Sequence, residues 1–76
     1  MITFNYYYFP KWLKNERINQ DLSVKDLSKK SNVSVSLINK IESGNDTSFI
    51  ATFKLANALG YNIHNTPTGI ELDKFR

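Results

Sequence analysis

The pattern of apolar and polar positions divides the chain into an extended start, a helical middle and an extended end. Residues 1–9 are rich in aromatic and β-branched side chains and begin with an apolar–polar alternation, which favours a strand. Pro10 ends this strand, and because proline suits a first helical position, we expect a helix from Pro10 to about Gln20. The residues expected to face the core from this helix are Trp12, Leu13 and Ile18.

A second helix is predicted to begin at Ser23, whose hydroxyl can cap the free N–H groups of the first turn. Asp26 follows three residues later and makes an acidic variant of the capping box. Asn32 tolerates the left-handed backbone that commonly ends a helix. Leu22 and Leu27 are the core candidates of this segment.

Two more helices follow, each opened by a serine and closed by a glycine. The third is expected after the cap residue Ser34 and ends at Gly44, and the fourth runs from the cap residue Ser48 to Gly60. The inward residues expected on the third helix are Leu37 (partly), Ile38 and Ile41. The wide apolar stripe of the fourth consists of Phe49, Ile50, Phe53, Leu55, Ala56 and Leu59.

The end of the chain changes to strand-like sequence. Residues 61–65 and 70–75 flank a segment with Pro67 and Gly69, which predicts a hairpin or an extended arm. A lone N-terminal strand cannot satisfy its backbone, so we expect the two ends of the chain to meet in a small antiparallel sheet. The predicted fold is mainly α: a single domain over 1–76 with an N-terminal strand (1–9), a helical core (10–60) and a C-terminal strand or arm (61–76).

Composition restricts the function classes. The 76-residue chain carries a net charge of +3 and no cysteine, so disulfides are excluded, and its single histidine makes a metal or cofactor site unexpected. No apolar run approaches the roughly 20 residues that span a bilayer, and the start lacks the features of a signal peptide, so a cytoplasmic protein is expected. We find no nucleophile–base pair or glycine-rich phosphate loop, so neither an enzyme nor a small-molecule ligand is expected. A partner subunit would add burial to so small a core.

The outer face of the third helix is unusual, because its side chains are short or hydrogen-bonding and none is acidic. Two short capped helices joined by a tight turn form the geometry that places side chains in a DNA major groove. An ordinary surface helix is the alternative, but serine and asparagine are mediocre helix formers. Lys40 can reach guanine, Asn39 can bond adenine, and Val35 can cover a thymine methyl. The full face consists of Val35, Ser36, Asn39 and Lys40.

The chain resembles a known family over residues 11–60. The matching positions are Arg17-Ile18, Leu22-Ser23, Asp26-Leu27-Ser28, Val33-Ser34, Ile38, Ile41-Glu42, Gly44 and Leu55-Ala56-x-Ala58-Leu59-Gly60. They resemble the Cro/CI (XRE-type) helix-turn-helix family of phage and bacterial repressors. The resemblance implies a lambda-repressor-like domain of four to five helices that binds operator DNA, usually as a dimer on a palindrome.

The resemblance also implies roles for individual residues. Base edges would be contacted by Ser34, Val35, Ser36, Asn39 and Lys40. The resemblance places Arg17, Ser43, Asn45, Thr47 and Ser48 near phosphates. The Arg17 position would pair with the Glu42 position and tie the first helix to the third. Apart from the resemblance, Ser23, Thr47 and Ser48 stand at helix N-termini that attract anions, and Lys25 lies close to one of them, so Ser23 and Lys25 are also expected phosphate contacts. Val24 departs from relatives, which often carry a phosphate-bonding glutamine there.

The strand-like end is closer to the Cro-like and HipB-like branches, in which a terminal strand pairs across the dimer. The expected dimer or partner interface is Tyr6, Tyr8, Tyr61, Ile63, Ile70 and Leu72. The first hypothesis is therefore a homodimeric repressor, encoded by a bacterium, phage or plasmid, that acts by occupying its operator. The second is an antitoxin that autoregulates its operon and touches a toxin through its tyrosine-rich start and through Glu71 and Asp73. The third is a protein-interaction module that keeps the fold without binding DNA.

Overall fold

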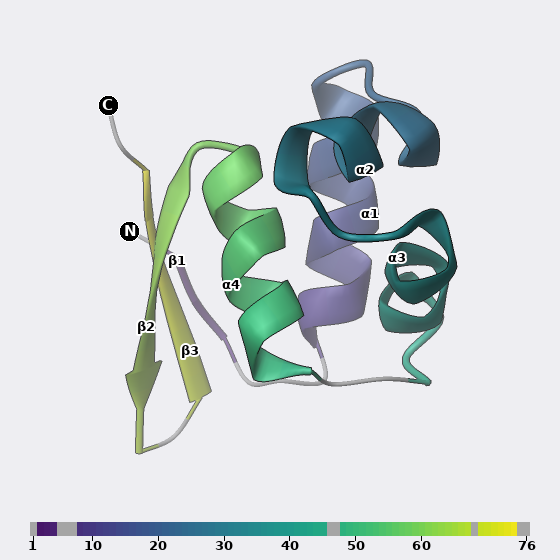
Figure 1. Ribbon diagram of the computed structural model, residues 1–76. Coiled ribbons are helices and arrows are strands. Elements are labelled where there is room, and N and C mark those ends of the chain that lie inside the picture. The colour runs from purple at the N-terminus through teal and green to yellow at the C-terminus, as the bar shows by residue number, and fades with distance from the viewer. Residues whose placement is uncertain (1, 5–7, 46–47, 68, 75–76) are drawn as a thin grey trace.

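The computed structural model of the chain describes residues 2–4, 8–45, 48–67 and 69–74. Within these residues the elements follow one another as β1 (Ile2–Phe4), α1 (Phe9–Asn19), α2 (Val24–Ser31), α3 (Val35–Glu42), α4 (Phe49–Ala58), β2 (Tyr61–Thr66) and β3 (Gly69–Lys74). The sheet lies on one side of the molecule and α3 on the other, with the other helices between them (Figure 1). The mainly helical fold with a small antiparallel sheet is confirmed.

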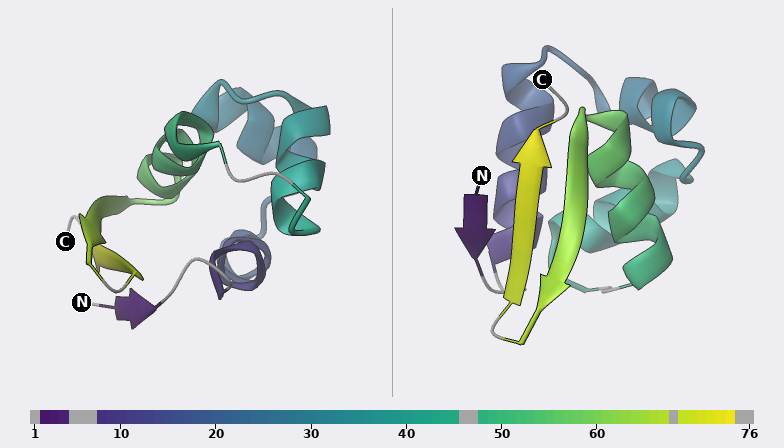
Figure 2. Two further views of the ribbon diagram at one scale, coloured as in Figure 1. Left: turned by 90° about the horizontal axis from the view of Figure 1, so that it is seen from below. Right: turned by 90° about the vertical axis from the view of Figure 1, so that its left-hand side faces the viewer.

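The two ends of the described chain meet in one three-stranded sheet. Its strand order is β1-β3-β2, and both pairings are antiparallel. Leu72 in the central strand β3 stands opposite Ile2 on one side and Ile63 on the other. Figure 2 shows β3 between the first strand and β2, as a hairpin joined by the N-terminal strand. The predicted hairpin and its pairing with the N-terminal strand are therefore confirmed.

One apolar core holds the helices and the sheet together. The side chains facing inward from β2 and β3 alternate along each strand, as expected for a sheet with one covered face. They are Tyr61, Ile63, Ile70 and Leu72. They join a cluster of fully buried helix residues, namely Leu13, Leu27, Ile38, Ile41 and Leu55. Because β3 is central and its inward residues are inaccessible, the sheet is part of the domain's core.

The serines begin their helices as the sequence predicts. Ser23 Oγ accepts the Asp26 N–H at 3.0 Å while Asp26 Oδ2 accepts the Ser23 N–H at 3.0 Å, so both bonds of a capping box are present. Ser34 Oγ accepts the Leu37 N–H at 3.1 Å, and the Ser48 hydroxyl accepts from the first turn of α4. Asn32 ends α2 in the left-handed region, with φ of 63°. These local bonds fix where α2, α3 and α4 begin.

The predicted boundary between the first strand and the first helix is wrong. Tyr8 and Phe9 were expected in the strand, but Tyr8 is the N-cap residue of α1 and Phe9 is the first helical residue. The physical reason is burial, since the Phe9 ring enters the core and lies 5.6 Å from the Trp12 ring. Ile18 was expected inside and is exposed, because Leu13 and Arg17 occupy the inward face of α1.

Part of the predicted apolar stripe on α4 is also wrong. Phe49, Ile50 and Phe53 are exposed, whereas the polar Thr52 is buried. The helix is apolar on most sides, so its sequence pattern does not distinguish the face that packs against α2 and β2. The inward face consists of Ala51, Thr52, Leu55, Ala56 and the following Leu59. Three large apolar side chains are left on the surface.

A polar contact joins α1 to the start of β2. The Tyr61 ring meets the Trp12 ring edge-on, with centroids 5.1 Å apart, and the Tyr61 hydroxyl donates to Glu16 Oε2 at 3.4 Å. Gln20 Nε2 donates both to that carboxylate and to the Leu59 carbonyl oxygen, each at 2.9 Å. Burial, and next the negative charge of Glu16, raise the pKa of Tyr61 above 10.0.

We predict that the pKa of Tyr61 in the folded chain lies above its ordinary value of 10.0. Because its folded pKa is raised, the Tyr61 hydroxyl contributes stability that is present below the unfolded pKa and is lost as pH rises through the folded pKa. Glu16→Gln removes the charge that opposes ionisation, so the Tyr61 pKa should fall towards 10.0. A ¹³C NMR titration of the tyrosine rings measures both values. A Tyr61 pKa at or below 10.0 in the unaltered chain would contradict the burial argument.

Candidate nucleic-acid interface

The helices α2 and α3 and the turn between them form one packed unit. After Asn32 reverses the chain, Val33 enters the core, and its N–H donates to the Ser31 hydroxyl at 3.2 Å. Leu27 from α2 and Ile38 from α3 are both fully buried, so the two helices share apolar contacts across the turn. This arrangement holds the N-terminus of α3 outward at the surface (Figure 1).

The structure brings the predicted base-contacting residues together on the exposed side of α3. Ile38 and Ile41 point into the core, Leu37 packs against it, and Glu42 bonds Arg17, which leaves the remaining positions of this helix facing outward. Val35 is 41% exposed, although it is apolar. The exposed set comprises Ser34, Val35, Ser36, Asn39 and Lys40. This surface has hydrogen-bonding groups, one aliphatic side chain and one cation, which are the groups that read base edges in a major groove.

An ion pair fixes α3 to α1. The Arg17 Nε–H donates to Glu42 Oε2 at 2.8 Å, and its Nη2–H donates to Glu42 Oε1 at 3.1 Å. The same guanidinium donates from Nη1 to the Leu22 carbonyl oxygen at 2.8 Å. The side chains of Arg17 and Glu42 are only 11% and 9% exposed. A two-bonded, largely buried pair of this kind restricts orientation as well as distance.

The remaining predicted phosphate contacts lie at helix ends. The exposed Lys25 is in the first turn of α2, beside Ser23. Hydrogen bonds from Ser23, mainly from its backbone N–H, lower the pKa of Asp26, so this carboxylate already occupies part of the α2 N-terminus. At the end of α3 the Ser43 hydroxyl donates to the Lys40 carbonyl oxygen at 3.0 Å, and Asn45 Nδ2 donates to the Ser43 hydroxyl at 3.2 Å.

Two further predicted phosphate contacts and the position that departs from relatives also lie in or near these helices along the chain. Ser48 caps α4, and Thr47 lies outside the described residues. Val24, which stands where relatives often have glutamine, is half-buried and packs against the core. Its side chain contributes apolar burial at the first position of α2 in place of a polar contact.

Four of the six predicted interface residues are not on the surface. Tyr61, Ile63, Ile70 and Leu72 are buried within their own chain, and a side chain buried there cannot contact a second subunit. That part of the prediction is wrong, because alternation along a strand identifies its covered face without identifying what covers it. Tyr8 is exposed, and Tyr6 lies outside the described residues.

Two features that would indicate other kinds of protein are absent from the described residues. None of the helices in residues 8–45 and 48–67 is long and apolar enough to cross a membrane. The described part of the chain also contains no group of three or more His, Cys, Asp or Glu side chains placed to hold a metal ion.

Comparison with known proteins identifies the family. A helix-turn-helix family model matches residues 13–64, which is more than half of the chain. The chain therefore belongs to the helix-turn-helix family of the XRE type, which includes Cro and CI. It is a DNA-binding transcription regulator in the general sense of that family. No curated protein and no solved structure matches the chain significantly.

We predict that Glu42→Ala lowers the free energy of unfolding by about 3–5 kcal/mol, because it leaves the Arg17 guanidinium buried without its carboxylate. Urea denaturation followed by circular dichroism measures this loss. Glu42→Gln is the matched control, since it keeps one acceptor oxygen and should cost less. A loss below about 1 kcal/mol for Glu42→Ala would mean that the pair behaves like a surface salt bridge.

Proposed function

We propose that the chain is a sequence-specific repressor that binds a palindromic operator as a homodimer and acts by occupying it. The exposed face of α3 carries the proposal. Its acid-free, hydrogen-bonding side chains are presented directly after the Ser34 cap, on a helix anchored by Ile38, Ile41 and the Glu42–Arg17 pair. A preorganised helix of this kind can enter a major groove without first having to fold.

Base recognition would come from four side chains. Lys40 would bond guanine O6 or N7, Asn39 would bond adenine N6 and N7, and Val35 would cover a thymine methyl. Ser36 can bond several bases and would discriminate little. Because α3 has no arginine, we expect direct readout to be modest and DNA shape to supply further selectivity.

Phosphate contacts would position α3 in the groove. Ser23 and Lys25 would approach the backbone from the start of α2, and Ser43, Asn45, Thr47 and Ser48 would do so from the segment between α3 and α4. The guanidinium of Arg17 is already bound to Glu42 and to the Leu22 carbonyl oxygen, so its main contribution would be to hold α3 in place.

Strand edges would mediate the dimer through backbone groups. Among the described residues β2 pairs only with β3, and β1 only with β3, so each leaves one edge for another chain. This differs from the interface expected from sequence, because the inward side chains of these strands belong to the core.

An antitoxin of a toxin–antitoxin pair is the second candidate. The observation that favours it is the exposed apolar surface of α4, because a contiguous patch of this kind marks a protein-binding surface more often than a DNA-binding one. Co-expression of the chain with the product of the neighbouring gene, followed by co-purification, tests this alternative.

We predict that Asn39→Ala and Lys40→Ala each reduce the preference for operator over scrambled DNA by about 1–3 kcal/mol, since each removes a base contact. Fluorescence anisotropy measures the preference, using DNA upstream of the chain's own gene and two salt concentrations. Because both side chains are exposed, the free energy of unfolding should change by no more than about 0.5 kcal/mol.

Lys14→Ala is the control for loss of a lysine, because Lys14 is exposed on α1 and not on α3. It should weaken binding to both DNA molecules equally, or not at all. Unchanged selectivity in both α3 variants would show that this helix does not read bases.

We predict two copies of the chain on one palindromic operator and weaker binding to an isolated half-site, because paired half-sites engage both α3 helices of a dimer. Sedimentation equilibrium of the protein with each DNA gives the stoichiometry, and anisotropy gives the two affinities. A single bound copy per palindrome, with the half-site affinity unchanged, would rule out the dimer.

A further inference from the structure

The exposed side of α4 carries three large apolar side chains that are not among the proposed DNA contacts. Phe49, Ile50 and Phe53 are 46%, 69% and 45% exposed, and they lie within two turns of one helix. Isolated apolar side chains are common on surfaces, but adjacent large ones mark a place where another molecule binds. Their burial by a partner would be favourable, since apolar area leaves water.

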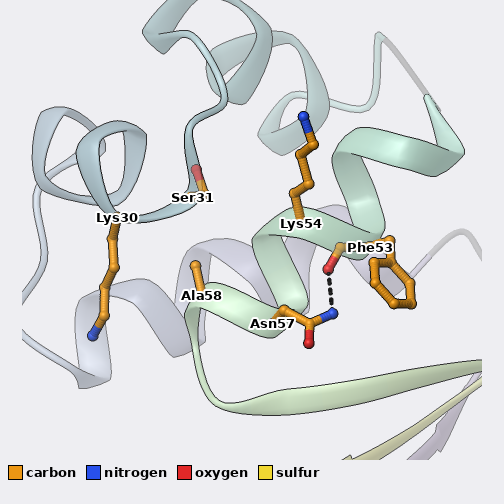
Figure 3. A pocket seen from close by; sticks show the side chains of 6 residues that line it. All are labelled: Lys30, Ser31, Phe53, Lys54, Asn57 and Ala58. Carbon is orange, nitrogen blue, oxygen red and sulfur yellow. Dashed lines mark hydrogen bonds between the residues drawn. The ribbon is translucent and has the colours of Figure 1, made fainter.

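Two hollows flank this side of α4. The first has a volume of about 350 Å³ and lies between the end of α2 and α4. Its lining residues are Lys30, Ser31, Phe53, Lys54, Asn57 and Ala58 (Figure 3). The second, of about 320 Å³, lies between the α2–α3 turn, α3 and the start of α4, and it includes Val33, Leu37 and Ile50. It also includes Ser34 and Ser48, which are proposed DNA contacts, so only the first hollow is separate from them. Both hollows include Lys54, so they adjoin each other along α4.

The charge around the hollows has one sign. Lys30 and Lys54 flank the first hollow, and neither has an ion pair within the described residues. In Figure 3 the two ammonium groups point away from each other, one on each side of Ser31 and Ala58. Among the described residues, no acidic side chain lines either hollow. The surface therefore combines an exposed phenyl ring with two cations that have no carboxylate partner there.

The chemistry of the surface favours a protein segment over DNA. Protein–DNA interfaces are polar, and a phosphate backbone would leave Phe53 and Ile50 without apolar contacts. The first hollow contains no residue of α3, whereas the second hollow, at the start of α4, also includes Ser34 and Leu37. Each hollow is near the lower limit of ligand pockets and opens to solvent, which suits single side chains of a bound polypeptide.

We propose that the groove between α2 and α4 binds an acidic segment of another protein in which an apolar side chain is flanked by carboxylates. The apolar side chain would lie against Phe53, and the carboxylates would face Lys30 and Lys54. Such complementarity selects the partner by charge and anchors it by burial of the apolar group. No residue of α3 lines this groove, so a bound segment would leave the base-contacting face of α3 uncovered.

The test uses a fluorescein-labelled peptide in which one phenylalanine is flanked on both sides by glutamates. Binding to the full chain is followed by anisotropy, and the contact surface is mapped by ¹H–¹⁵N NMR. A peptide with lysines in place of glutamates, and one with serine in place of phenylalanine, should bind more weakly. The amide signals that shift should be those of the end of α2 and of α4.

Matched variants locate the contact. Lys54→Glu should weaken binding of the acidic peptide about threefold or more, because it reverses a charge at the groove. Lys14→Glu changes the net charge equally but is exposed on α1, so it should have a smaller effect. Phe53→Ala should weaken binding, whereas Phe49→Ala deletes an equally exposed ring that lines neither hollow and should weaken it less.

Several results would overturn this assignment. Equal losses of peptide affinity for Lys14→Glu and Lys54→Glu would show that only the net charge matters. Equal losses for Phe49→Ala and Phe53→Ala would show that the peptide binds the apolar surface of α4 without using the groove. No peptide binding, together with weaker DNA binding by Lys54→Glu, would assign the groove to nucleic acid. If the chain binds the peptide but shows no DNA selectivity, the peptide-binding role of the groove is supported and the proposed repressor function is contradicted.

Discussion

The orientation of α3 depends on the buried ion pair between Arg17 and Glu42. An eight-residue helix is too short to be stable by itself in water, so its position must come from packing and from fixed polar contacts. Ile38 and Ile41 supply the packing, but apolar contacts alone permit small rotations. The bidentate guanidinium removes that freedom. Its third bond, to the Leu22 carbonyl oxygen, also connects α1 to the segment just before α2. One side chain of α1 thereby positions both helices of the helix-turn-helix.

The sheet supplies core that four short helices do not. Its inward residues lie in the same cluster as Leu13 and Leu55, and Ile70 and Leu72 are as completely buried as any helix residue. Because the central strand is β3, the segment that follows the helix-turn-helix is necessary for its packing. The resemblance implied four to five helices, and this chain closes its core with strands after α4. An interface between two chains must then use strand edges or helix surfaces, since the inner face of the sheet is filled.

Sequence reasoning was reliable where a short-range bond decides the structure. The caps at Ser23, Ser34 and Ser48 need only a hydroxyl and a free N–H three residues later, and all three formed. It failed where the burial of a side chain depends on which other helix or strand packs against its own helix. Ile50 is exposed and Thr52 buried because of where α2 and β2 pack on α4, and this is not contained in the pattern of α4 itself. The five residues expected to contact bases share one exposed face because Ile38 and Ile41 fixed its phase.

The helix α2 connects the proposed DNA-binding surface to the groove beside α4. Its start carries Ser23 and Lys25 towards the proposed DNA backbone, and its end carries Lys30 and Ser31 to the groove beside α4. Eight helical residues span about 12 Å, which is close to the screening length of about 10 Å at 0.1 M salt. An acidic segment in the groove would therefore be repelled only weakly by bound phosphates at about 0.1 M salt, and more strongly at low salt. Separate surfaces on so small a domain are thus linked by charge, and DNA and an acidic partner would each weaken the binding of the other.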